Sequence, residues 1–246
     1  MAKRKKIIVA GALVLEAVYP AVNSRDKAGV RAGKRKISSE AQKRMNAIYS
    51  YQKLELLLAA NFVPGDIVCT LTYDDRHLPA SRKAAEAKLK YFRQKLAATR
   101  KQRGATLVMF WNSEHRHGDG RWHHHCILNS TGDDFAEILK LWGQGEIEFT
   151  PLRVDREKNY ATLARYMAKE GRERVGQRSW SYTRNARKPE VETYLVPNDE
   201  KLKPPRTAIV FEDTGDVQTE YGHYRFIKYL CASSVTARRR ARRRRK

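Results

Sequence analysis

The chain has 246 residues, of which 41% are hydrophobic and 31% charged, which is typical of one or two globular domains. Lysine and arginine outnumber aspartate and glutamate by 50 to 27, so the formal net charge is +23. Eight of these charges lie in residues 238–246, which leaves +15 on the rest of the chain. Such an excess predicts a polyanionic partner: nucleic acid first, and an anionic membrane surface as the weaker alternative.

The sequence argues against a membrane protein, a disulfide-rich protein and a nucleotide-driven motor. Its longest apolar run, Ile7–Leu15, contains Gly11 and is too short to span a bilayer. The three cysteines, Cys69, Cys126 and Cys231, are odd in number and far apart, which favours a reducing cytoplasm. No phosphate-binding loop of the GxxxxGK[ST] type occurs. We expect a cytoplasmic protein that contacts no membrane and uses no nucleotide cofactor.

Hydrophobic periodicity and capping residues predict an alternation of strands and helices along the chain. The expected elements are, in chain order, a strand over residues 7–17, a basic loop over 24–36, a helix over 39–60, a strand over 66–73, a helix between Ser81 and Gly104, strands over 105–114 and 121–128, a short helix over 133–142, a strand over 146–154, a helix over 157–170, a basic segment over 172–188, and a strand pair over 207–213 and 217–229. This order predicts an α+β fold, with helices packed on a central antiparallel sheet.

Four segments are expected from composition and from the positions of the predicted elements. They are an N-terminal strand with a basic loop (1–37), a main domain (38–200), a C-terminal hairpin packed on that domain (201–236), and a disordered arginine-rich tail (237–246).

The most informative stretch is residues 114–128, EHRHGDGRWHHHCIL, which reads as a hairpin around a glycine-rich turn. Two short loops are plausible: Gly118-Asp119 would place Glu114 opposite His123, and Asp119-Gly120 would place it opposite His125. Either loop puts these three residues on one sheet face, because side chains alternate along a strand, and His124 then points to the other face. One carboxylate and two imidazoles predict a divalent-metal site, although the set does not name the metal. The alternative is a histidine-rich hairpin on a solvated surface.

The predicted helix over 157–170 carries a second candidate, Tyr166. Tyr160, Leu163 and Met167 form its apolar stripe, and Tyr166 lies at the edge of that stripe with Lys169 one turn further on. A tyrosine hydroxyl there is placed to act as a nucleophile. Taken alone, this Tyr-x-x-Lys pattern is more typical of an ordinary boundary tyrosine, with a buried ring and a wet hydroxyl.

Together these patterns resemble the HUH endonucleases, and more closely the rolling-circle replication initiators of bacterial plasmids and phages. Three motifs occur in the order found in that family, and the resemblance covers about residues 61–189. They are Thr70-Leu71-Thr72-Tyr73, the segment Trp122-His123-His124-His125 together with Glu114, and Tyr166-Met167-Ala168-Lys169. One departure is His124, because the family usually has an apolar residue at that position. Strand parity favours His123 and His125 as the metal ligands.

The resemblance implies a fold, a chemistry and a setting. The main domain would be an RRM-like HUH nuclease domain, in which Glu114, His123 and His125 hold Mn²⁺ or Mg²⁺. Tyr166 would attack the scissile phosphate and form a 5′-phosphotyrosyl bond, and Lys169 would steady the phosphate. The reaction would nick and rejoin a single-stranded or hairpin origin, with a host helicase and polymerase as partners in a bacterial cytoplasm. A relaxase, a transposase or a non-catalytic nucleic-acid-binding regulator are the alternatives.

The basic segment over 172–188 interleaves arginines with two aromatic residues, a combination suited to phosphates and to unpaired bases. The alternative is a solvated loop that one aromatic pair anchors to the core. The predicted DNA-binding residues are Arg172, Arg174, Arg178, Trp180, Tyr182, Arg184, Arg187 and Lys188. The arginine tail should add salt-sensitive affinity that does not depend on sequence.

Overall fold

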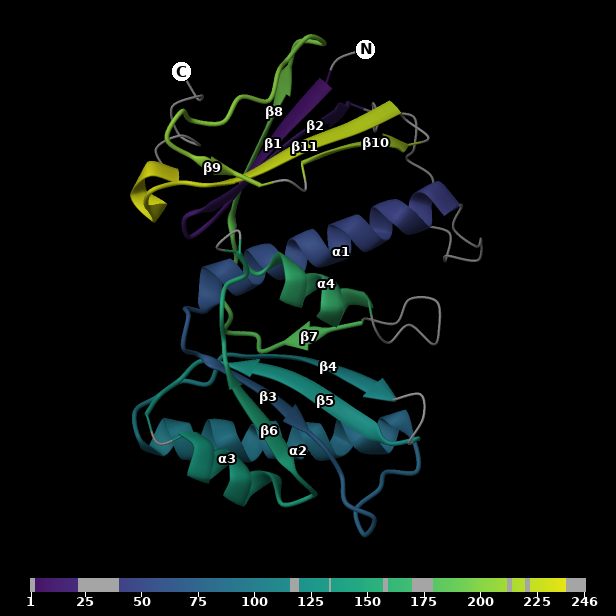
Figure 1. The fold of residues 1–246 in the computed structure, drawn as a ribbon, viewed down its shortest axis with the longest axis vertical. Coiled ribbons are helices and arrows are strands. Elements are labelled where there is room, and N and C mark those ends of the chain that lie inside the picture. The colour runs from purple at the N-terminus through teal and green to yellow at the C-terminus, as the bar shows by residue number, and fades with distance from the viewer. Residues whose placement is uncertain are drawn as a thin grey trace. The chain divides into compact units, whose positions relative to one another are not determined.

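The computed structural model describes residues 3–21, 40–115, 120–132, 134–156, 159–169, 179–211, 214–219 and 222–237. The chain divides into two compact units, Asn61–Arg187 and Met1–Ala60 together with Lys188–Lys246 (Figure 1). Both combine antiparallel strands with helix, so the α+β class predicted from the sequence is confirmed. In the part of the chain that is described, no helix has the length and apolar character needed to cross a membrane.

In the unit Asn61–Arg187, the described residues form a five-stranded antiparallel sheet in the order β6-β3-β5-β4-β7. The strands are β3 (Ile67–Leu71), β4 (Met109–His115), β5 (Trp122–Leu128), β6 (Ile147–Pro151) and β7 (Ser181–Tyr182). The central strands alternate between two buried faces, which is why β5 reads as a nearly continuous buried run.

Helices lie on both faces of this sheet (Figure 1). On one face, α2 (Arg82–Gln102) and α3 (Asp134–Trp142) pack Leu89, Phe92 and Trp142 against side chains of β3 and β5. The predicted cap of α2 is confirmed, because Ser81 Oγ accepts the N–H of Ala84 at 3.2 Å. The short helix α4 (Ala161–Lys169) lies on the opposite face. That face carries the candidate site.

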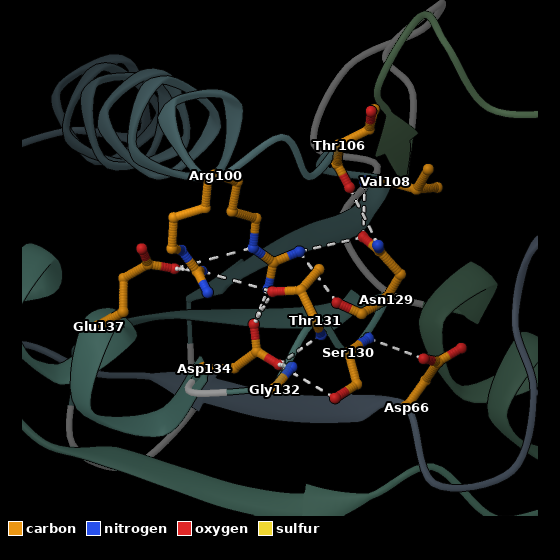
Figure 2. A network of polar contacts seen from close by, with 11 residues as sticks. Asp66, Arg100, Thr106, Val108, Asn129, Ser130, Thr131, Gly132, Asp134 and Glu137 are labelled. Carbon is orange, nitrogen blue, oxygen red and sulfur yellow. Dashed lines mark hydrogen bonds and ion pairs between the residues drawn. The ribbon is translucent and has the colours of Figure 1, made fainter.

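A buried polar network joins the end of α2 to the start of α3 (Figure 2). The Arg100 guanidinium donates to Asp134 Oδ1 at 2.7 Å and to the carbonyl of Asn129 at 2.9 Å. Asp134 also accepts the backbone N–H of Thr131 at 2.6 Å. Burial alone would raise the pKa of the Asp134 carboxyl, but the hydrogen bonds from Thr131 and Ser130 and the charge of Arg100 outweigh burial and lower it.

The lowered pKa gives a testable dependence of stability on pH. The Asp134 charge stabilises the fold fully above the pKa of an unfolded aspartate, about 4, and this stabilisation is lost as the pH falls through the folded value. We expect Asp134→Asn to lower the free energy of unfolding at neutral pH, and the gap to wild type to narrow in acid. Urea denaturation across this range measures the gap. A constant gap from neutral pH to below about 3 would contradict the assignment.

In the other unit, described strands form a six-stranded antiparallel sheet in which β9 pairs with β11 beside the path β10-β11-β2-β1-β8. The strands are β1 (Lys3–Ala10), β2 (Leu13–Pro20), β8 (Glu190–Val196), β9 (Ile209–Val210), β10 (Gly215–Thr219) and β11 (Gly222–Leu230). The helix α1 (Glu40–Asn61) packs Met45 and Leu56 into the same core as Leu15 and Phe226. Buried ion pairs join Lys5 to Glu16 at 3.0 Å and Lys228 to Glu55 at 2.6 Å.

The structure corrects several predicted elements. The run over 7–17 is two strands, β1 and β2, because Gly11 takes a positive φ of 62° and reverses the chain. The run over 217–229 is likewise two paired strands, β10 and β11. The strands β7 and β8 were not predicted. The helix predicted over 157–170 begins only at Ala161, where Asn159 Oδ1 accepts the N–H of that residue at 3.0 Å.

The segments expected at the two ends of the chain meet in one sheet, since β1 and β2 pair with β8 and β11. The compact units divide the chain at 60/61 and 187/188. The boundaries at 37, 200 and 236 stay predictions. The basic loop over 24–36 and tail residues 238–246 lie outside the described residues.

Candidate functional site

The β4–β5 hairpin sets the geometry of the site. Its register pairs Glu114 with His123 and Asn112 with His125, which is the register expected for a loop at positions 118 and 119. Paired residues share a face, so these four side chains lie on the α4 side of the sheet. The turn residues 116–119, which include His117, lie outside the described residues.

His125 is the centre of the contacts on this face. Its Nε2 lies 2.9 Å from Glu114 Oε2, and its Nδ1 lies 3.2 Å from Thr70 Oγ1 on the neighbouring strand. An ionised carboxylate only accepts, so the contact with Glu114 assigns a hydrogen to Nε2, and the neutral ring then accepts the Thr70 hydroxyl at Nδ1. Thr70 therefore orients the imidazole. The sequence marked its strand but gave no sign of this role, which depends on the register between β3 and β5.

Tyr166 reaches the same imidazole from α4. Its Oη lies 3.1 Å from His125 Nε2, and the two rings meet edge to face with centroids 5.2 Å apart. The Tyr166 side chain is 46% exposed, so its hydroxyl is open to a macromolecular substrate. The phenol predicted at the edge of the apolar stripe thus lies on the same sheet face as Glu114, His123 and His125. Lys169 ends α4, but its side chain lies outside the described part.

His124 faces the opposite side of the sheet and is completely buried. Its Nε2 lies 2.7 Å from the Tyr73 hydroxyl and its Nδ1 2.8 Å from Ser113 Oγ. Burial, followed by the nearby imidazoles of His125 and His123, lowers the pKa of His124 to about 3, so the ring is neutral at physiological pH. It fills a core position with its polar atoms satisfied.

This placement predicts different roles for the three consecutive histidines. We expect His124→Leu to bind Mn²⁺ as wild type does, with some loss of stability because Tyr73 and Ser113 lose their partner. His123→Leu and His125→Leu should each weaken Mn²⁺ binding by about tenfold or more, given that changes even in the surroundings of a metal ligand cost about 10–100-fold. Isothermal titration calorimetry separates the three. Tight binding by His125→Leu together with loss in His124→Leu would reverse the assignment.

The donor set suits a hard or borderline divalent ion, with one carboxylate and two imidazoles on one face. Glu114 and His125 are already in contact, and His123 lies opposite Glu114. Within the described residues, however, no three histidine, cysteine or acidic side chains are grouped closely enough to hold an ion as they stand. Metal binding would require Glu114 to turn from His125 toward a shared ion.

The basic segment is only partly described. Arg172, Arg174 and Arg178 lie outside the described residues. Tyr182 stacks on Phe110 of β4, with ring centroids 5.2 Å apart and planes at 17°, and the Trp180 ring lies 5.8 Å from Tyr182. Both aromatic side chains remain partly exposed, and the nearby Arg184, Arg187 and Lys188 are exposed. The aromatic pair therefore anchors the segment to the sheet and still offers ring surface to solvent.

One comparison with known proteins finds a match. Residues 66–171 match the replication-associated protein (ORF2) family, and the matched stretch begins just before β3 and ends just beyond α4. It contains Glu114, the three histidines and Tyr166. Neither the curated proteins nor the solved structures include a match to this chain. The similarity associates this part of the chain with replication initiation.

Proposed function

We propose that the protein nicks and rejoins one DNA strand at a replication origin, with Tyr166 as the nucleophile, as HUH endonucleases of rolling-circle replication do. The observation that carries the proposal is the 3.1 Å approach of Tyr166 Oη to His125 Nε2, on the face shared with Glu114 and His123. The family match supports the setting, because residues 66–171 contain all four residues.

Glu114, His123 and His125 would hold the divalent ion, Mn²⁺ or Mg²⁺. When bound, such an ion polarises the scissile phosphate and offsets the charge that develops on it. The lone pairs of the two imidazoles must be available to the ion, so the hydrogen now shared between His125 and Glu114 would leave on binding. Thr70 would hold the His125 ring in place through Nδ1, as it does in this structure.

The chain's own part in the reaction is to supply and aim the nucleophile. Tyr166 Oη attacks phosphorus, the bond from phosphorus to the 3′ oxygen breaks, and the phenol proton passes to solvent. The products are a 5′-phosphotyrosyl link and a strand whose 3′ oxygen has taken up a proton. One phosphodiester replaces another, so attack by a 3′-hydroxyl on the phosphotyrosine rejoins the strand without an energy source. Lys169 would steady the phosphate.

The charge of the chain supports a DNA substrate. The partly exposed rings of Trp180 and Tyr182 offer stacking surface to unpaired bases, and the exposed Arg184, Arg187 and Lys188 suit the phosphates. The free 3′-hydroxyl would prime synthesis by a host polymerase, with a host helicase opening the duplex.

The proposal is tested with labelled single-stranded oligonucleotides tiled across the origin of the DNA that encodes the protein. With Mn²⁺ we expect a covalent protein–DNA band that resists denaturation, together with a shorter labelled strand, and neither product with a chelator present. Tight binding without either product in Mn²⁺ would instead indicate a non-catalytic regulator.

A further inference from the structure

A pocket of about 490 Å³ lies beside Tyr166, between α4 and the β6 edge of the sheet. It is within the range of roughly 300–1,000 Å³ that small-molecule sites occupy. The lining residues used below are Val68, Thr150, Leu152, Asn159, Leu163 and Tyr166. Val68 and Thr150 pair across β3 and β6 and share the face of Thr70, so the pocket continues the candidate site toward the edge strand.

The wall of the pocket suits a flat neutral group better than an anion. Val68, Leu152 and Leu163 contribute apolar surface. The one acidic side chain among the described wall residues, Asp155, accepts the backbone N–H of Asn159 at 3.2 Å and that of Thr162 at 3.4 Å. A carboxylate in the wall repels a phosphate, whereas an aromatic ring packs on the aliphatic side chains at no electrostatic cost.

The pocket wall also contains a hydrogen-bond donor that the described part of the protein does not use. Asn159 is more than nine-tenths buried, and its Oδ1 accepts the N–H of Ala161 at 3.0 Å, which fixes the orientation of the amide. Its Nδ2 is buried and has no acceptor among the described residues within hydrogen-bonding distance. Buried donors in native proteins are nearly always satisfied, so an unused one in a pocket wall points to an acceptor supplied by a ligand.

We propose that this pocket receives one unpaired nucleobase of the strand that Tyr166 attacks, with the ring on the apolar wall and an acceptor on the base edge paired to Asn159 Nδ2. The inference rests on the proposed function, because Tyr166 lines both the pocket and the candidate site. A base held there would fix the position of the neighbouring phosphodiester relative to Tyr166. The pocket would therefore contribute to the choice of the nicking site.

Filling the pocket tests the proposal by DNA binding alone. Thr150 is exposed on the edge strand, so Thr150→Trp should place an indole in the pocket without disturbing the core. Leu139→Trp is the control, since Leu139 is exposed on α3, across the sheet. The probes are fluorescent oligo(dT) of about 12 nucleotides and an abasic chain of the same length, compared by fluorescence anisotropy.

We expect Thr150→Trp to weaken oligo(dT) binding about tenfold, the effect of losing one stacked base, and to leave binding of the abasic chain unchanged. Asn159→Asp keeps the Oδ1 acceptor that caps α4 but loses the donor, and should weaken oligo(dT) binding more than binding of the abasic chain. Wild-type oligo(dT) binding by both variants, or equal losses on both probes, would overturn the proposal.

The same binding measurements on Tyr166→Phe separate the two claims. The contrast between the probes should persist in this variant, because binding a base requires no nucleophile. A persisting contrast without any covalent product in the wild type would leave the pocket and overturn the proposed function. A covalent product without the contrast would do the reverse.

Discussion

Tyr166→Phe should abolish the covalent protein–DNA product, by more than about 10³-fold, and leave DNA binding unchanged. The substitution removes only the oxygen that we assign as nucleophile. The ring keeps its edge-to-face contact with His125, at a centroid separation of 5.2 Å. Denaturing gels with labelled single strands measure the product, and anisotropy measures the binding.

Tyr160→Phe is the matched control, because Tyr160 lies one residue before α4 and is buried, with its hydroxyl 3.5 Å from the carbonyl of Phe62. Burial raises the pKa of Tyr160 to about 12, which makes it a poor source of phenolate. This variant should form the covalent product at the wild-type level. A wild-type level of product in Tyr166→Phe would show that another residue is the nucleophile.

The largest effect on stability is expected from Arg100→Met. Arg100 is fully buried, and its guanidinium pairs with Asp134, whose side chain is also buried. Removing one partner of a buried pair typically costs about 3–5 kcal/mol, because the other charge is left without compensation. Urea denaturation followed by circular dichroism measures the free energy of unfolding.

Arg103→Met is the control for this prediction. Arg103 contacts Glu137 at 2.9 Å near the end of α2, but its side chain is much more exposed, so its loss should cost at most about 1 kcal/mol. Equal effects of the two substitutions would contradict the importance of the buried network in Figure 2.

Local patterns predicted much of the fold around the site. Ser81 and Gly104 enclose α2, which runs from Arg82 to Gln102, because an N-cap hydroxyl and a glycine of positive φ act within one turn of the helix. The parity of the β4–β5 hairpin followed from the period of two in a strand. It holds for either loop, so Glu114 could be placed beside two histidines before the register was known.

Other features depend on contacts between distant segments and leave little local signal. The edge strand β7 has two residues and exists through its pairing with Phe110 and Trp111. Helical phase placed Tyr166 only at the edge of a stripe. Its approach to His125 spans 41 positions in sequence and requires α4 to lie on this face of the sheet. Asn159 gave no signal, because its unused donor appears only once the pocket has formed.

The most direct test of the central claim is to digest the covalent protein–DNA product formed in Mn²⁺ and to sequence the DNA-linked peptide by mass spectrometry. We predict a peptide that contains Tyr166, with the DNA attached to the tyrosine oxygen through its 5′ phosphate. A link at any other residue, or cleavage that leaves a free 5′ phosphate and no linked peptide, would contradict it.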